Sequence, residues 1–179
     1  MDFKTSKTFQ NIMNAINGEM MASTRYKIYS DKAREDGYEQ IGDVFAETSH
    51  NEKEHAEAFL KIMFNGELPS TLDNLKNSYE GENSEWTKIY KDYAQTAMDE
   101  GYPDIANLFS GVAAIENHHD YRFRNLANNI KNDAVFCKDE NVMWICMNCG
   151  NLWFDKCAPE HCPVCGYPQS YFKINCENY

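Results

Sequence analysis

The sequence has few prolines, no surplus of basic residues and no long apolar run. Only 5 of its 179 residues are proline, and 17 Lys and Arg stand against 28 Asp and Glu, for a formal net charge of −11. Nucleic-acid binding depends on basic side chains that neutralise phosphates, so this balance disfavours such a partner. No stretch is apolar enough to cross a bilayer, and the polar N-terminus lacks the apolar segment of a secretory signal. We therefore expect a cytoplasmic protein that binds neither nucleic acid nor a membrane.

The residues that are abundant divide the chain into two parts. Residues 8–132 are rich in Glu, Lys, Ala, Met and Leu and contain only two prolines, a composition typical of helices. All 7 cysteines follow, beginning at Cys137. This change predicts a helical domain of residues 1–135 and a small cysteine-rich domain of residues 136–179.

The helical part predicts four helices in two hairpins. Apolar residues recur at alternating steps of three and four, which is the pattern of a helix with one core-facing stripe. Gly37 and Gly101 mark short turns, and residues 66–81 form a longer link, followed by a helix from about Glu82 to Glu100. This order predicts an all-α four-helix bundle.

The two hairpins repeat one another at an offset of 64 residues. The matched pairs are Tyr26 and Tyr90, Tyr29 and Tyr93, Gly37 and Gly101, Phe45 and Phe109, Glu52 and Glu116, and His55 and His119. A slip of one residue also lets Glu19 match Glu82. Copies of this kind are related by an approximate two-fold axis, so we expect their repeated polar residues to converge.

A Glu-x-x-His motif occurs once in each hairpin and places a carboxylate and an imidazole on one helical face. A single motif is weak, because solvated pairs and hydrogen-bonded core histidines look the same. Two motifs on core stripes, with one further Glu on each of the other helices, match the ligand set of a di-iron or di-manganese bundle. Gathered carboxylates would be protonated unless divalent cations compensated them. The predicted ligands are Glu19, Glu52, His55, Glu82, Glu116 and His119.

Three further residues have two interpretations each. Glu85 shares the helical face of Glu82, and the first hairpin has no equivalent carboxylate. Glu85 is either an extra ligand that replaces a histidine when the metal is oxidised, or a Glu that the helix dipole favours in the first turn. Tyr26 and Tyr90 lie about two turns beyond Glu19 and Glu82. They either hydrogen-bond ligand carboxylates or are ordinary core aromatics.

The C-terminal part contains two Cys-x-x-Cys-Gly motifs, a strong signal for a tetrahedral four-thiolate metal site. The motif alone favours structural zinc, whereas the surrounding aromatic residues and a redox-active dimetal bundle in the same chain favour a single iron. The predicted ligands are Cys146, Cys149, Cys162 and Cys165. The remaining cysteines have no partner at ligand spacing and are expected to be free thiols or packing residues. They are Cys137, Cys157 and Cys176.

Together these motifs resemble the rubrerythrin family over essentially the whole chain. The matching stretches are Gly18–Glu19, Glu52–Ala56, Gly81–Glu85, Glu116–His119 and Ala158–Gly166. The resemblance implies a ferritin-like di-iron bundle followed by a rubredoxin-like domain. It also implies that Glu85 is an iron ligand that exchanges with His55. One departure is Asn151, which follows the first cysteine motif where an aromatic residue is common.

The resemblance further implies a non-haem di-iron peroxidase that reduces hydrogen peroxide to water in oxidative stress defence. By this resemblance, two irons bind in the helical bundle and a third iron binds to the four cysteines. Electrons come indirectly from a reduced nicotinamide cofactor, through a separate reductase or rubredoxin, and enter at the third iron of a head-to-tail homodimer. The residues assigned to catalysis are Glu19, Glu52, Glu85, Glu116, Tyr26 and Tyr90. Two other classes stay open, an iron-oxidising storage protein and a non-catalytic protein with structural zinc.

Overall fold

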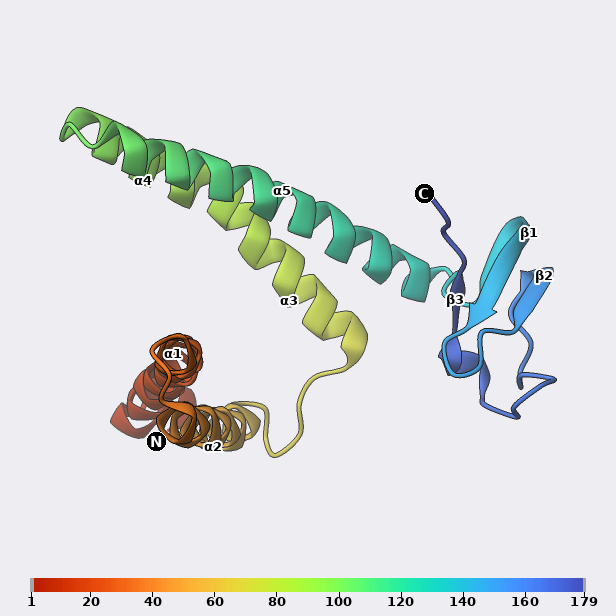
Figure 1. The fold of residues 1–179 in the computed structure, drawn as a ribbon. Helices are drawn as coiled ribbons and strands as arrows, with labels where there is room; N and C mark the ends of the chain where they lie inside the picture. Colours follow the sequence, from red (N-terminus) through yellow and green to blue (C-terminus); the bar gives the residue numbers. More distant parts are fainter. Residues whose placement is uncertain (1, 179) are drawn as a thin grey trace. The chain divides into compact units, whose positions relative to one another are not determined.

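The computed structural model describes residues 2–178 and divides into two compact units, residues 1–69 and residues 70–179. The first unit is a helical hairpin. The second is a helical hairpin followed by a small sheet (Figure 1). None of the helices in residues 2–178 combines the length and the apolar composition that a bilayer crossing requires.

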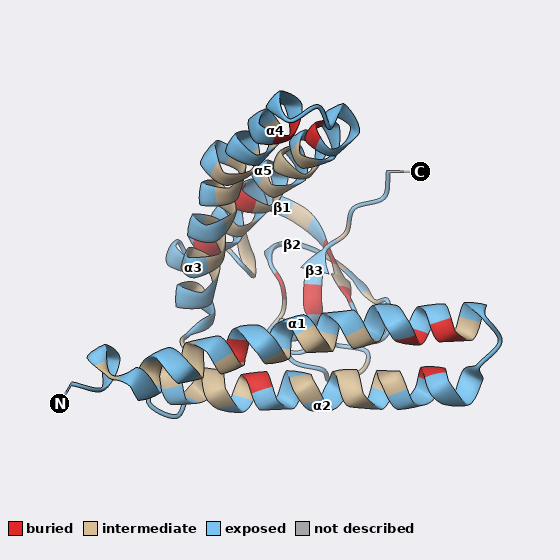
Figure 2. Cartoon of the chain, turned by 90° about the vertical axis from the view of Figure 1, so that its left-hand side faces the viewer, coloured by how far each residue is buried: buried red, intermediate tan, exposed pale blue. Residues whose placement is uncertain are grey.

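The first hairpin consists of helices α1 (Lys7–Glu35) and α2 (Glu39–Met63), which lie antiparallel after a short 3-10 helix, η1 (Phe3–Thr5) (Figure 2). Ser6 caps α1, because its Oγ accepts a 3.1 Å hydrogen bond from the Phe9 amide. Gly37 follows the helix with a φ of +83°, which a side chain would disfavour. The predicted end of this helix at Gly37 is confirmed.

The second hairpin pairs α5 (Pro103–Lys131) with one long helical segment made of α3 (Thr71–Ser84), a π-helical turn η2 (Glu85–Ile89) and α4 (Tyr90–Asp99). The predicted start of this segment near Glu82 is wrong. The helix begins at Thr71 because Ser70 caps it, accepting a 3.2 Å hydrogen bond from the Asp73 amide while its hydroxyl donates to the Asp73 carboxylate at 2.7 Å.

The π-helical turn η2 explains the one-residue slip in the sequence repeat. Eight positions separate Glu82 from Tyr90, whereas seven separate Glu19 from Tyr26. A π turn accommodates one residue more than an α turn, so the segments before and after it keep the same faces as their copies in the first hairpin. Such turns often occur at functional sites.

The internal repeat is also visible in the packing of aromatic rings. Each hairpin contains a group of two tyrosines and one phenylalanine whose ring centres lie 5.5–6.5 Å apart. These groups are Tyr26, Tyr29 and Phe45 in the first hairpin, and Tyr90, Tyr93 and Phe109 in the second. The predicted copies therefore share tertiary contacts as well as sequence.

Much of the predicted core stripe is exposed in each hairpin. Ile41 and Ile62 are 49% and 47% exposed, and their counterparts in the second hairpin, Ile105 and Leu126, are 46% and 48% exposed. Figure 2 shows few buried positions on either hairpin. Each hairpin therefore presents an apolar face that its own two helices do not cover.

The small domain is a three-stranded antiparallel sheet in the order β2-β1-β3, built from β1 (Cys137–Cys146), β2 (Leu152–Cys157) and β3 (Phe172–Ile174). A 3-10 helix, η3 (Gln169–Tyr171), precedes β3. Trp144, Ala158 and Phe172 form its buried core together with two of the predicted cysteine ligands. Four helical segments followed by this domain confirm the predicted fold class, ferritin-like helices with a small rubredoxin-like domain.

Two cysteines expected to be free are joined. Cys137 and Cys157 form a disulfide, with their Cα atoms 4.0 Å apart. The prediction was wrong because it considered spacing along the chain, whereas the pairing of β1 with β2 places these two residues opposite each other at one end of the ladder. Cys176 is free and exposed, as expected.

Candidate metal centres

The first hairpin gathers three predicted ligands. Glu19 comes from α1, whereas Glu52 and His55 come from consecutive turns of α2. His55 Nδ1 lies 2.8 Å from a Glu52 carboxylate oxygen and 3.9 Å from a Glu19 carboxylate oxygen. Each residue offers one ligand atom, and these atoms all lie within 4.8 Å of one another. The arrangement is a three-ligand cluster on one side of the hairpin.

The second hairpin carries the same cluster. Glu82 comes from α3, and Glu116 and His119 come from α5. His119 Nδ1 lies 2.6 Å from a Glu116 carboxylate oxygen and 3.7 Å from a Glu82 carboxylate oxygen. The near equality of these distances with those of the first hairpin follows from the repeat. We name the two groups the Glu19 cluster and the Glu82 cluster.

The electrostatics of the Glu82 cluster favour a bound cation. Burial raises the pKa of Glu82, and the neighbouring Glu116 and Glu85 raise it further, whereas His119 lowers it. Carboxylates with these neighbours are most readily kept ionised by a divalent metal, and carboxylate with imidazole suits iron or manganese. The donor set of both clusters therefore fits iron.

Glu85 lies beside the Glu82 cluster. It is the first residue of the π turn and is half-buried. Burial raises the pKa of Tyr90, and the next largest cause is the negative charge of Glu85. In the described part of the chain, the tight group of ligand atoms holds Glu82, Glu116 and His119 without Glu85. The role of Glu85 as an extra ligand in one hairpin therefore stays a prediction.

The two tyrosines proposed near the clusters pack against aromatic rings. The ring centre of Tyr26 lies 6.1 Å from that of Phe45, and the ring of Tyr90 stacks on that of Phe109 with their centres 6.0 Å apart. His118 is exposed, and its ring stacks on the ring of Tyr121.

One buried carboxylate was missed by the sequence reasoning. Asp120 is only 4% exposed and accepts 3.0 Å hydrogen bonds from Asn83 Nδ2 and from Trp86 Nε1. It also pairs with Arg124 one turn later. Burial opposes ionisation of Asp120, but the hydrogen bonds outweigh it and hold its pKa below the usual range. The sequence did contain a signal for this residue, because Asp120 directly follows the predicted ligand His119 on a helix with a core-facing stripe.

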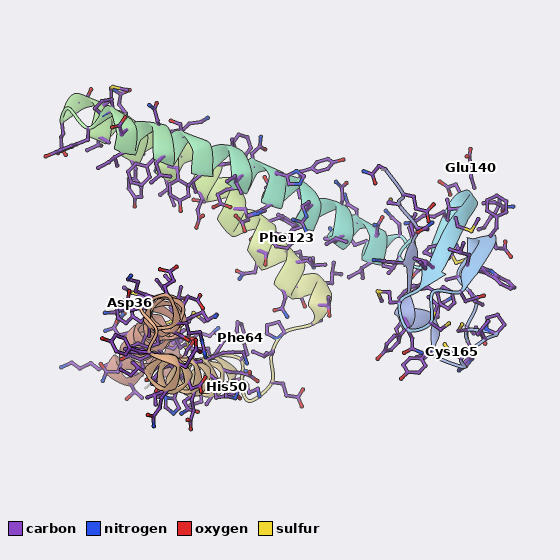
Figure 3. All side chains as sticks on the ribbon, in the orientation of Figure 1. Asp36, His50, Phe64, Phe123, Glu140 and Cys165 are labelled. Atoms are coloured by element: carbon purple, nitrogen blue, oxygen red, sulfur yellow. A yellow bond between two sulfur atoms is a disulfide. The ribbon has the colours of Figure 1, made fainter. Side chains whose placement is uncertain are left out.

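This carboxylate connects the two sides of the second hairpin. Asn83 precedes the π turn and Trp86 lies within it, while Asp120 follows the ligand His119 on α5. The contacts therefore hold the π turn, and with it Glu85, at a fixed height along α5. Figure 3 draws all described side chains as sticks and labels Phe123 on α5.

The four predicted cysteine ligands converge in the small domain. Cys146 Sγ lies 3.8 Å from Cys165 Sγ, and Cys149 Sγ lies 3.6 Å from Cys162 Sγ. Gly150 and Gly166 both have positive φ, which lets each motif turn tightly around the sulfurs. The amide of each glycine donates to the carbonyl of the first cysteine of its motif, at 2.8 and 2.9 Å. This geometry fits one tetrahedral metal ion.

Four adjacent thiols do not ionise equally. The Asn151 amide favours the Cys149 thiolate, but the other three sulfurs and burial together raise the pKa of Cys149 to about 12. Hydrogen bonds from Asn148 and from the Tyr167 backbone lower the pKa of Cys165 to about 6. A metal ion removes this conflict, because it stabilises all four thiolates at once.

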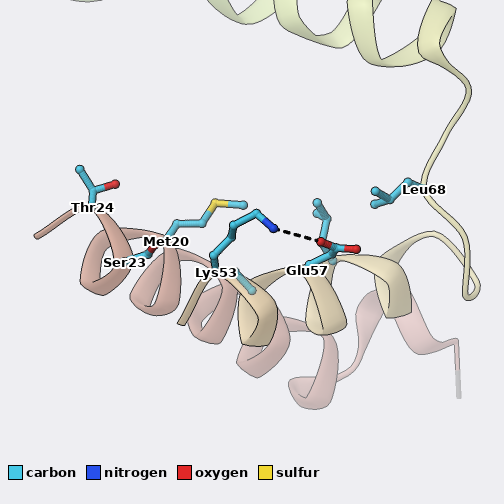
Figure 4. A pocket seen from close by; sticks show the side chains of 8 residues that line it. Met20, Ser23, Thr24, Lys53, Glu57 and Leu68 are labelled. Atoms are coloured by element: carbon cyan, nitrogen blue, oxygen red, sulfur yellow. Dashed lines mark ion pairs between the residues drawn. The ribbon is translucent and has the colours of Figure 1, made fainter. Parts of the chain in front are cut away.

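A groove on the first hairpin lies apart from the metal ligands. Its volume is about 470 Å³, and its lining is mainly apolar, with Met20, Leu60 and Leu68 (Figure 4). Lys53 and Glu57 of α2, whose charged atoms are 3.6 Å apart, also line the groove. It includes none of the residues of the Glu19 cluster, so it is not the metal site.

Comparison with known proteins agrees with both kinds of metal site. The rubrerythrin family model matches residues 10–127 and 73–142, and the model of the rubrerythrin rubredoxin-like domain matches residues 144–173. Rubrerythrin-1 of Clostridium acetobutylicum is 41% identical, and rubrerythrin of Clostridium perfringens is 42% identical, each over 98% of this chain and 98% of its own length.

A solved structure is also similar in sequence. The solved structure of nigerythrin in a mixed-valence state is 29% identical over 96% of this chain and 88% of its own, with a TM-score of 0.36. The family models and the full-length relatives are decisive. This chain belongs to the rubrerythrin family of oxidoreductases, with a di-iron domain and a rubredoxin-like domain.

Proposed function

We propose that the protein is a non-haem di-iron peroxidase that reduces hydrogen peroxide to water in the cytoplasm as an oxidative stress defence. The observation that carries the proposal is the duplicated carboxylate–histidine cluster in a chain that also holds four converging thiols. The carboxylate–histidine clusters provide a place for two-electron chemistry, and the four thiols provide a place where single electrons can enter.

The Glu19 and Glu82 clusters are the proposed ligands of the two irons, joined by Glu85. Each cluster offers two carboxylates and one imidazole, so two clusters and one extra carboxylate provide seven ligands for a dimetal centre.

Two ferrous ions held by these ligands would supply the two electrons and the charge stabilisation that peroxide reduction requires. The chain's own residues would orient the ligand side chains and balance the charge of the metals. Glu52 and Glu116 accept hydrogen bonds from the imidazoles beside them, if those rings carry the proton on Nδ1, and so hold both histidines in place. Glu85 is the proposed carboxylate that replaces His55 on the more highly charged metal. Tyr26 and Tyr90 are proposed to line the centre.

The four-cysteine site is the proposed electron port. Cys146, Cys149, Cys162 and Cys165 would hold a single iron there, which would supply one-electron chemistry. We propose a separate reductase or rubredoxin as donor, with a reduced nicotinamide cofactor as the indirect source. In a head-to-tail homodimer the port of one chain would serve the dimetal centre of its partner.

The experiment is a comparison of oxidants. The protein is loaded with iron, reduced under anaerobic conditions and mixed with hydrogen peroxide or with dioxygen in separate stopped-flow runs. A peroxidase is oxidised at least about tenfold faster by peroxide than by dioxygen, and the protein binds about three irons per chain. A ferritin-like storage protein would instead react readily with dioxygen and accumulate many more irons per chain. Zinc retained in the four-cysteine site after iron loading would contradict the proposal that electrons enter there.

A further inference from the structure

The disulfide between Cys137 and Cys157 lies outside both kinds of iron site. In the described residues, the metal-ligating sulfurs are those of Cys146, Cys149, Cys162 and Cys165, so the disulfide uses none of them. It joins the first residue of β1 to the last residue of β2. The four-cysteine motifs begin at the other end of this pair of strands. The two cysteines therefore form a second sulfur site in the same small domain.

The disulfide closes the joint at which the chain leaves α5 and enters the sheet. Only residues 132–136 separate α5 from Cys137. Next to the disulfide, the Ala158 amide donates a 2.9 Å hydrogen bond to the Phe136 carbonyl, and Gln169 Nε2 donates to the Ala158 carbonyl at 2.6 Å. Lys138 Nζ also donates a hydrogen bond to the Ala134 carbonyl. The joint is therefore held by hydrogen bonds and by one covalent bond that can be broken by reduction.

Both sulfurs are within reach of small reagents. Cys157 is exposed and Cys137 is half-buried. A pocket of about 630 Å³ lies against Cys137 and is also lined by Val135, Phe136 and Gln169. Exchange between thiols and disulfides requires access to one sulfur, and exposed disulfides are the labile ones. Disulfides in a reducing compartment are usually catalytic or redox-sensing.

We propose that Cys137 and Cys157 form a reversible thiol–disulfide site that is oxidised by a hydroperoxide and reduced by a dithiol, and that its oxidation fastens the joint between α5 and the sheet. The Cys157 thiolate, the more exposed of the two, attacks peroxide, so that an S–O bond forms, the O–O bond breaks and one water leaves. The Cys137 thiol then attacks the sulfenic sulfur, the S–S bond forms and a second water leaves. Two electrons and two protons pass from the thiols to the peroxide.

The test uses the full-length protein loaded with iron. The protein is treated with a dithiol reductant, freed of it, and kept with all irons ferric so that the metal centre does not consume peroxide. One portion then receives hydrogen peroxide. Thiols are blocked with an alkylating agent, and peptides are mapped by mass spectrometry. Cys137 and Cys157 should both be alkylated before peroxide and be joined in one peptide pair after it, while the visible absorption of the four-cysteine iron is unchanged.

Variants separate the two roles. In Cys137→Ser, peroxide should leave Cys157 as a sulfenic acid that a cyclic dione traps. In Cys157→Ser, trapping at Cys137 should fall at least about fivefold, because that sulfur is less exposed. Cys176→Ser is the matched control and should preserve the disulfide. Amide hydrogen exchange at Ala158 and at residues 133–136 should be faster in the reduced wild-type protein than in the oxidised one.

Three results would overturn the proposal. These are alkylation of both cysteines at the same level before and after peroxide, a disulfide of either one to Cys176 in place of the pair, and exchange at Ala158 that does not change with the redox state. The peroxidase proposal is independent, because the double variant Cys137→Ser/Cys157→Ser should keep its three irons and its oxidation by peroxide through the reduced metals.

Discussion

Trp86 Nε1 donates a 3.0 Å hydrogen bond to the buried carboxylate of Asp120, and this bond ties the π-helical turn to α5. The π turn carries Glu85, while Asp120 follows the ligand His119. The bond therefore connects the turn that carries Glu85, the proposed extra ligand, with the helix that carries Glu116 and His119 of the Glu82 cluster.

Trp86→Phe should lower the stability of the second hairpin. The substitution removes one donor to a buried charged group, a loss worth about 1–3 kcal/mol. Denaturant unfolding followed by helical circular dichroism measures it. Trp153→Phe is the matched control, because the buried Nε1 of Trp153 has no partner among the described residues. Equal effects of the two substitutions would show that the bond to Asp120 contributes nothing.

Deleting Thr87 should convert the π turn into ordinary α-helix. The deletion removes the extra residue, so the segments before and after the turn keep their faces, as in the first hairpin, but Glu85 loses the position that the π turn gives it. We expect the protein to stay helical and to lose at least half of its dimetal iron, measured as iron per chain. Thr87→Ala is the control at the same exposed position. Full iron occupancy after the deletion would contradict a role for the turn in placing ligands.

The metal-free protein should become less stable as pH rises through the titration of Glu82. Burial raises the pKa of this residue in the folded state, so folding favours its protonated form. The associated stability is fully present below the ordinary Glu pKa of about 4.3 and is lost as pH rises through the raised folded value. Thermal unfolding from pH 4 to 8 should show this loss in the wild type and not in Glu82→Gln. The exposed Glu47→Gln should behave as the wild type.

Metal binding at the four cysteines should release protons and strengthen with pH. Cys149, with a pKa of about 12, is a thiol at neutral pH and must lose its proton to bind metal, whereas Cys165, with a pKa of about 6, is already ionised. Calorimetry in two buffers of different ionisation enthalpy, with zinc as the titrant, counts the protons. A count of at least one at pH 7 is expected, and Cys176→Ser should not change it. A count of zero would contradict the thiol state assigned to Cys149.

Glu85→Ala should slow peroxide turnover and leave the fold intact. Removal of a carboxylate that acts on the metals costs about tenfold or more. Turnover is measured with a saturating reduced donor, and circular dichroism checks the fold. Glu80→Ala, one turn earlier and exposed, is the control. A rate equal to that of the control would remove Glu85 from the proposed mechanism.

The three clusters of candidate metal ligands could be predicted because they depend largely on local geometry. Residues three apart on a helix share a face whatever the rest of the chain does, and Cys-x-x-Cys carries its own turn. The start of α3 was missed because Gly81 resembles a breaker, although the cap at Ser70 was visible in the sequence. The cause of the slip before Tyr90 could not be read either, since a π turn has no distinct composition.

The disulfide and the buried Asp120 depend on contacts that spacing does not encode. Cys137 and Cys157 become neighbours only through the register of β1 with β2, including the irregularity between Cys137 and Val142. Asp120 is held by Trp86 across the hairpin, and a charged residue beside a ligand can equally be solvated. Tertiary pairing decides both cases.

The central claim is that reduced iron in the dimetal centre and in the four-cysteine site serves one peroxide reaction. The direct measurement is an anaerobic titration of the fully reduced protein with hydrogen peroxide, followed by the absorption of the four-cysteine iron. Three ferrous ions hold about three electrons, so the account predicts an endpoint near 1.5 peroxides per chain, with the four-cysteine iron oxidised within the same titration. An endpoint near 1.0 with that iron still reduced would contradict electron transfer between the two sites.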